Sequence, residues 1–157
     1  MMNIPHTLPP IEALLPHRDT MLLLDRVVEY ENDTVVAECT PRSDAWYADA
    51  EGQMPGWIGV ELMAQAVAAH VGLSKRQSGL PVKQGVLLGT RRYTTHAPAF
   101  PADEPLRIKA VMIFIDESGL GAYACHIYSG ESELASATLK VYEPENFDAF
   151  LKRELND

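Results

Sequence analysis

One segment of the chain has the pattern of a long apolar helix, and the segments on either side of it have the pattern of strands. Residues 55–76 are mostly small or apolar, with a proline in the first turn and with Lys75 and Arg76 in the last turn before Gly79. Proline is favoured at the start of a helix, and positive charge and glycine are favoured at its end. The sequence therefore predicts one long helix over these residues.

Strand patterns surround this helix. Runs of apolar and β-branched residues, partly in alternation with polar ones, cover residues 21–30, 34–40, 85–96, 106–115, 121–128 and 133–142. A polar triplet between the first two runs predicts a hairpin, and short helices are expected at residues 11–15 and 145–155. This order predicts one α+β domain over residues 1–157, in which an antiparallel sheet of five or six strands wraps around one central helix.

Composition and charge narrow the range of functions. The 157 residues are 46% hydrophobic and 22% charged, as in ordinary globular domains. The net charge of -9 argues against binding to nucleic acid or to an anionic membrane, so an acidic partner would need a local basic cluster. Cys39 and Cys125 lie in apolar contexts without CxxC spacing, and the first residues lack the pattern of a signal peptide. We therefore expect reduced thiols and a cytoplasmic protein, with no membrane span.

The long helix also carries residues that suggest chemistry. Glu61 is the only charged residue within residues 56–73, so burial would favour the protonated form that a proton donor needs. Gln65 follows one turn later on the same face, where it could orient the carboxylate or a substrate hydroxyl. Gly56 lies at the helix start, where unpaired N–H groups can bind an oxyanion. Each feature also has a structural explanation: a solvated carboxylate, a satisfied amide and an ordinary helix start.

Three motifs in order carry a resemblance to a known family. They are LLPHRDTMLLLDRVVEY from Leu14, MPGWIGVELMAQ from Met54 and LLGTRRYTTHAPAFPADEPLRI from Leu87. The chain resembles the hotdog-fold β-hydroxyacyl-(acyl carrier protein) dehydratases of fatty acid synthesis and, more finely, the dehydratase-like subunits of aryl polyene pigment clusters. The resemblance implies a hotdog fold, a carboxylate at Glu61, an oxyanion-binding amide at Gly56 and substrate contacts from Pro55, Trp57 and Gln65. It implies neither a cofactor nor a metal.

The chain departs from this family at the catalytic base. The dehydratases have a histidine seven residues before the position that Met54 matches, and here that position is Tyr47. Because the ordinary pKa of a tyrosine is about 10, forming its phenolate at pH 7 costs roughly 4 kcal/mol. Tyr47 is thus expected to be a poor base, although it could donate a hydrogen bond to a substrate. Packing beside Trp46 is the better explanation.

No other histidine replaces the missing base on sequence grounds. The family carries the motif of His17 apart from its catalytic histidine, so His17 is expected to be structural. His70 is out of phase with Glu61 on the helix, and His96 and His126 fit ordinary strand positions. The spacing of the histidines suggests no metal site.

Three functions remain open from the sequence. The first is a dehydratase subunit that acts on acyl chains bound to acyl carrier protein, with Arg91 and Arg92 as candidates for docking the carrier. Since family members form dimers with shared sites, Glu61 and the Gly56 amide could serve a histidine from a partner dehydratase, whereas a homodimer would lack a complete site. The second is a non-catalytic stabilising or acyl-binding subunit. The third is an acyl thioesterase that uses Glu61 to activate water.

Overall fold

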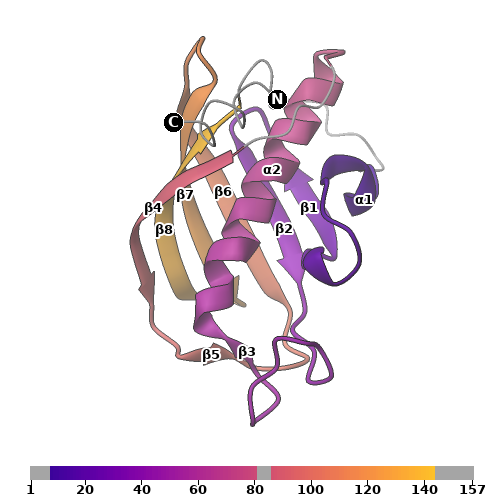
Figure 1. The fold of residues 1–157 in the computed structure, drawn as a ribbon, viewed down its shortest axis with the longest axis vertical. Coiled ribbons are helices and arrows are strands. Elements are labelled where there is room, and N and C mark those ends of the chain that lie inside the picture. The colour runs from indigo at the N-terminus through magenta and orange to yellow at the C-terminus, as the bar shows by residue number, and fades with distance from the viewer. Residues whose placement is uncertain (1–7, 81–85, 144–157) are drawn as a thin grey trace, which may run out of the picture.

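The computed structural model describes residues 8–80 and 86–143, and a six-stranded antiparallel sheet forms its frame. The strand order is β1-β2-β6-β7-β8-β4, so β1 and β4 lie at the two edges (Figure 1). The strands are β1 (Arg26–Tyr30), β2 (Thr34–Cys39), β4 (Val86–Thr95), β6 (Leu106–Ile115), β7 (Leu120–Ser129) and β8 (Ser132–Tyr142). The predicted fold class is confirmed, and β1 and β2 form the predicted hairpin.

The long helix α2 (Gly59–Gln77) crosses one face of this sheet (Figure 1). A single 3-10 turn, η2 (Gly56–Ile58), precedes it, so the helical segment agrees closely with the prediction. The buried side of α2 packs against the apolar face of the sheet, and the largest fully buried side chains from both include Leu62, Met63, Tyr123, Ile127 and Leu139. Small residues let the chain lie close to α2. At Gly72 an added Cβ would lie only 2.9 Å from the Leu14 carbonyl oxygen.

Two short elements bring the start of the chain onto α2. The helix α1 (Ile11–Leu14) and the 3-10 turn η1 (Asp19–Met21) both precede β1, and Ile11, Leu14 and Leu24 are buried in the core. The strand expected from residue 21 thus begins only at Arg26, because residues 19–21 form the turn η1 and residues 22–25 are not part of the strand. The helix expected at residues 145–155 lies outside the described residues.

The sequence did not predict one pair of short strands. The two-residue strands β3 (Met54–Pro55) and β5 (Ala99–Phe100) pair in antiparallel fashion at the end of the molecule where α2 begins (Figure 1). Met54 and Phe100 are both fully buried. This pairing fixes the chain that enters the helix, and it therefore positions the residues around Gly56.

The buried cysteines and His70 agree with their expected structural roles. Cys39 and Cys125 are free buried thiols, and burial raises the pKa of each to about 12. His70 is buried between the Tyr123 hydroxyl, 2.7 Å from Nδ1, and the Asn32 carbonyl, 3.0 Å from Nε2. Among helices in the described ranges, none combines the length and hydropathy needed to cross a bilayer.

Candidate active site

A cavity of about 620 Å³ runs along the exposed side of α2. Its helix wall consists of residues one or two turns apart, namely Glu61, Ala64, Val67, Ala68, Val71, Ser74, Lys75 and Ser78. The opposite wall comes from the strands and their connections, including Ile115, Tyr123 and Val141, and from residues before β1, including Leu14 and His17. Since 17 residues of helix span roughly 25 Å, the cavity is long enough for an extended chain.

Glu61 lies at the end of this cavity nearest the start of α2. Its side chain is 40% exposed, so the burial expected from its apolar sequence neighbours is not observed. The reason is that the helix turns this position toward the cavity instead of the sheet. Its Oε1 atom accepts a hydrogen bond of 2.9 Å from the amide of Gln65, one turn further along. The carboxyl group is therefore both held in place and accessible.

Gln65 is fully buried behind Glu61 and uses both ends of its amide. The amide nitrogen donates to the Met21 carbonyl at 2.7 Å as well as to Glu61. The amide oxygen accepts from the backbone N–H groups of Leu23 and Leu24, at 3.0 and 3.3 Å. Of the two roles expected for Gln65, this geometry supports the orientation of the carboxylate. Gln65 also ties the segment before β1 to the helix.

His17 is the residue at this site that the sequence reasoning missed. Its Nε2 atom lies 3.4 Å from Oε1 of Glu61, and both side chains line the cavity. His17 was expected to be structural, because its motif is separate from the family's catalytic histidine. No local sequence pattern marks this contact, because it forms only when the segment before β1 packs against α2.

The residues around Gly56 lie at the entry to the helix and do not line the cavity. The Gly56 N–H donates to the Pro98 carbonyl at 2.8 Å, next to the pairing of Pro55 with Ala99, and the Tyr93 hydroxyl donates to the Gly56 carbonyl. An oxyanion could therefore bind the Gly56 amide only if it displaced Pro98. Trp57 is 67% exposed and faces solvent in the single chain.

Tyr47 is held within its own loop. Its side chain is buried, and its hydroxyl accepts a hydrogen bond of 3.0 Å from the backbone N–H of Arg42. Its ring meets Trp46 edge to face, with ring centres 5.6 Å apart. Burial raises the pKa of Tyr47 above its ordinary value, which makes a phenolate base still less accessible. These contacts support the packing role for Tyr47.

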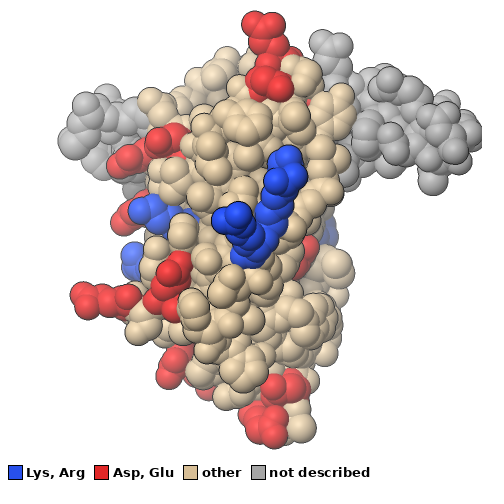
Figure 2. Space-filling model, turned by 90° about the vertical axis from the view of Figure 1, so that its left-hand side faces the viewer, with Lys and Arg blue, Asp and Glu red and all other residues tan. Residues whose placement is uncertain are grey.

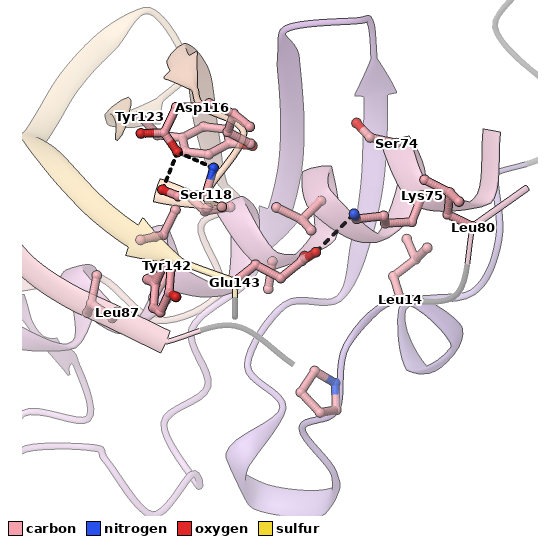
Figure 3. Close-up of a pocket in the computed structure, with 18 of the residues that line it drawn as sticks. Leu14, Ser74, Lys75, Leu80, Leu87, Asp116, Ser118, Tyr123, Tyr142 and Glu143 are labelled. Carbon is pink, nitrogen blue, oxygen red and sulfur yellow. Dashed lines mark hydrogen bonds and ion pairs between the residues drawn. The ribbon is translucent and has the colours of Figure 1, made fainter. Parts of the chain in front are cut away.

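The far end of the cavity is polar. Lys75 forms an ion pair of 2.9 Å with Glu143, and Asp116 accepts hydrogen bonds from the Ser118 hydroxyl and backbone N–H (Figure 3). The Ser118 hydroxyl is the main reason why the pKa of Asp116 is lowered. Between this end and Glu61 the helix wall is made of Ala64, Val67, Ala68 and Val71. The cavity thus has an apolar middle between two polar ends.

Arg91 and Arg92 are exposed on the edge strand β4. Figure 2 shows the side of the molecule that this edge faces, where basic side chains gather near the middle and acidic ones lie nearer the margins. By contrast, Lys75 is paired with Glu143, and the Arg18 guanidinium donates to the backbone carbonyls of Leu15 and His17. Of these cations, the two arginines on β4 are better placed to meet an acidic partner.

This geometry defines a class of protein. An antiparallel sheet wrapped around one long helix is the arrangement of a hotdog-fold protein. A family model described as ApeP-like, ApeP dehydratase, matches residues 9–152. The chain therefore belongs to the ApeP-like dehydratase family.

Similar proteins of known structure and curated name agree with this assignment. The structure titled "The Dehydratase Heterocomplex ApeI:P from Xenorhabdus doucetiae" contains a chain that is 26% identical, with a TM-score of 0.88, and the match covers 96% of this chain and 100% of that one. The 3-hydroxyacyl-(acyl-carrier-protein) dehydratase FabZ of Anaeromyxobacter sp. (strain K) is 36% identical over 98 residues. That match covers 59% of this chain and 63% of the relative, so the chain spans less than two thirds of the curated protein's length.

A more distant structure shows the fold alone. The chain titled "Crystal Structure of Hypothetical Thioesterase Protein with Coenzyme A from Streptococcus pneumoniae TIGR4" is 17% identical, with a TM-score of 0.60, over 75% of this chain and 84% of that one. At this identity the likeness does not favour a thioesterase. The predicted hotdog fold and the resemblance to dehydratases of the ApeP type are confirmed.

Proposed function

We propose that this chain is a dehydratase subunit for β-hydroxyacyl thioesters on acyl carrier protein, and that it works together with a histidine-bearing hotdog dehydratase. The observation that carries the proposal is the contrast between Glu61 and Tyr47. Glu61 is held at a cavity by Gln65, while Tyr47 is buried and bonded within its own loop where the family has its base. The chain keeps the acid of the reaction and lacks the base.

The reaction would divide between the two subunits. A histidine of the partner would take the proton from the carbon next to the thioester, and Glu61 would give a proton to the departing hydroxyl group. A carbon–carbon double bond forms as the C–H and C–O bonds break, and water leaves. The Gly56 N–H would stabilise the negative charge on the thioester oxygen only once the substrate displaces the Pro98 carbonyl that now accepts its hydrogen bond. Each proton is accounted for, and neither a cofactor nor a metal is required.

Two relatives support a hetero-oligomer and a carrier-bound substrate. The similar chain from Xenorhabdus doucetiae comes from a structure whose title names a dehydratase heterocomplex, and FabZ is named for an acyl carrier protein substrate. In this chain the edge strand β4 exposes Leu87 and Leu88, which suits it for pairing with a second sheet. The aryl polyene pathway, the hetero-oligomer and a cytoplasmic location remain predictions.

The direct test compares the chain alone with its mixture with a histidine-bearing hotdog dehydratase, with turnover of β-hydroxyacyl carrier protein as the readout. Glu61→Gln nearly preserves the shape and hydrogen bonding of the side chain but removes its acid. In the mixed complex this change should reduce the rate by about 10²–10⁴-fold, since general acid catalysis is worth that much. Tyr47→Phe should have a much smaller effect.

One outcome would favour the non-catalytic alternative. If Glu61→Gln leaves the complex fully active while the corresponding change in the partner abolishes turnover, the working site uses the partner's carboxylate. The chain would then be a stabilising subunit. The satisfied packing of Tyr47 is the observation that keeps this second function under test.

Docking of the carrier is tested separately. Acyl carrier proteins are acidic, so the exposed pair on β4 should attract them. Exchange of Arg91 and Arg92 for glutamate should raise KM for carrier-bound substrate and leave KM for a small thioester unchanged. Lys109→Glu is the charge-matched control for each arginine changed singly, because Lys109 is an exposed cation on β6, which β7 and β8 separate from β4. Equal effects of the two changes would assign the loss to net charge and not to docking.

A further inference from the structure

The segment that carries His17 is fixed to α2 on both sides of the histidine. Before it, the Leu14 carbonyl lies directly over Gly72. After it, Gln65 binds the backbone of Met21, Leu23 and Leu24. The position of the imidazole ring along the cavity is therefore set by the backbone and not by an exposed loop.

Arg18 fixes the backbone of His17 more closely. Its guanidinium donates hydrogen bonds to the carbonyls of Leu15, at 2.6 Å, and His17, at 2.7 Å. These bonds turn the Arg18 side chain back onto the segment, so its charge supports the local backbone. The His17 side chain is left 26% exposed beside Glu61.

The two neighbours of the Glu61 carboxyl group meet at the same oxygen. Gln65 donates to Oε1 at 2.9 Å, and Nε2 of His17 lies 3.4 Å from that atom. Within the described residues, no hydrogen bond or ion pair reaches Oε2. With one oxygen surrounded by nitrogen groups, the other is the atom that can carry a proton and transfer it.

The second ring nitrogen of His17 is unusual. Nδ1 is buried and has no hydrogen-bond partner within the part of the chain that the structure describes. An unpaired buried lone pair is less unfavourable than an unpaired buried N–H, so the ring is best accommodated with its hydrogen on Nε2, facing Glu61. Buried polar atoms without partners are rare in folded proteins. A substrate cannot reach Nδ1, because that atom is buried, and in this arrangement Nε2 carries the hydrogen that faces Glu61.

We propose that His17 is a positioning residue that, together with Gln65, holds Oε1 of Glu61 so that Oε2 delivers the proton to the departing hydroxyl group. This inference rests on the proposed function, because it concerns the same carboxyl group. It adds a residue and names the reacting oxygen. The contact of 3.4 Å is longer than a hydrogen bond, and such contacts commonly shorten when substrate binds.

The test uses the complex with a histidine-bearing dehydratase and two variants of His17. His17→Leu removes the contact with Glu61, and a carboxyl group displaced by about 1 Å should lose roughly 10- to 100-fold in kcat with little change in KM. In His17→Gln the amide nitrogen can occupy the place of Nε2 and donate to Oε1, although it cannot accept and release a proton. Glutamine should therefore restore most of kcat. His96→Leu, which removes an exposed histidine elsewhere, should leave kcat unchanged.

Each outcome decides something. If His17→Leu keeps full kcat, the proposal is wrong. If glutamine is as inactive as leucine in an assembled complex, His17 exchanges protons and the positioning role is wrong. Sedimentation and thermal unfolding show whether each variant still folds and assembles with the partner dehydratase.

If the leucine variant fails to assemble, His17→Asn replaces it, because the shorter asparagine amide cannot reach Oε1 of Glu61. Glu61→Gln, measured in parallel, separates the two proposals, since a fully active Glu61→Gln complex overturns the proposed function itself.

Discussion

Replacing Gln65 with leucine tests whether this side chain fastens the start of the chain to α2. Leucine is similar in size, but it leaves the Met21 carbonyl and the N–H groups of Leu23 and Leu24 without their partner. One of the lost bonds is buried and two are partly buried. Because each unpaired buried group costs about 1–3 kcal/mol, with the lower end for partly buried ones, the free energy of unfolding should fall by roughly 3–5 kcal/mol.

Urea unfolding followed by circular dichroism measures this change. Gln77→Leu is the matched control, since Gln77 lies on the same helix, is exposed and accepts one hydrogen bond of 3.2 Å from the Tyr30 hydroxyl. That hydroxyl also lies 3.1 Å from the Ser74 hydroxyl, so the control should lose less than about 1 kcal/mol. If the loss of unfolding free energy in Gln65→Leu is within about 1 kcal/mol of the loss in the control, Gln65 contributes little to holding the segment before β1 on α2. The fixed position inferred for His17 would then be wrong.

Other expected outcomes follow from the same structure. The purified chain alone should show little or no dehydratase activity, and robust turnover lost with a single histidine would contradict this. Burial lowers the pKa of His70, so the unfolded chain binds a proton at this residue more readily than the folded chain as the pH falls. Below about pH 6.5 the free energy of unfolding should therefore fall by up to about 1.4 kcal/mol per pH unit. A His70→Gln variant should lack this part of the pH dependence. Gly72→Ala should lower the unfolding free energy by about 1–3 kcal/mol through contact with the Leu14 carbonyl, whereas Gly89→Ala, with no atom within 4 Å of its Cβ, should not show this clash.

The fold was predictable wherever one pattern decided it. The long helix, the order of the main elements along the chain and the first hairpin follow from apolar periodicity, proline and glycine, and the structure confirms them. The pairing of β3 with β5 has no such pattern, because each strand has two residues and the contact joins parts of the chain that lie far apart in sequence. The late start of β1 has a related cause. Residues 22–24 are apolar like a strand, but Gln65 binds the backbone N–H groups of Leu23 and Leu24.

The candidate site was predictable only where its residues lie close together in sequence. Glu61 and Gln65 lie one helical turn apart, so their hydrogen bond could be expected from spacing alone. The exposure of Glu61 could not be predicted, because its apolar neighbours in sequence do not show whether its side chain faces the sheet or a cavity. His17 meets Glu61 only because the start of the chain folds back onto α2, and a contact of that kind leaves no local signal.

The hydrogen-bond partners of Tyr47 and His17 point to opposite roles. The Tyr47 hydroxyl has its partner, its ring has a neighbour and its burial opposes ionisation, so every observed interaction serves the folded state. His17 has a buried nitrogen with no partner in the described chain and faces a carboxyl group that stays accessible to a cavity. Under the proposed function, His17 therefore acts beside Glu61, whereas the observed contacts of Tyr47 are those of a packing residue.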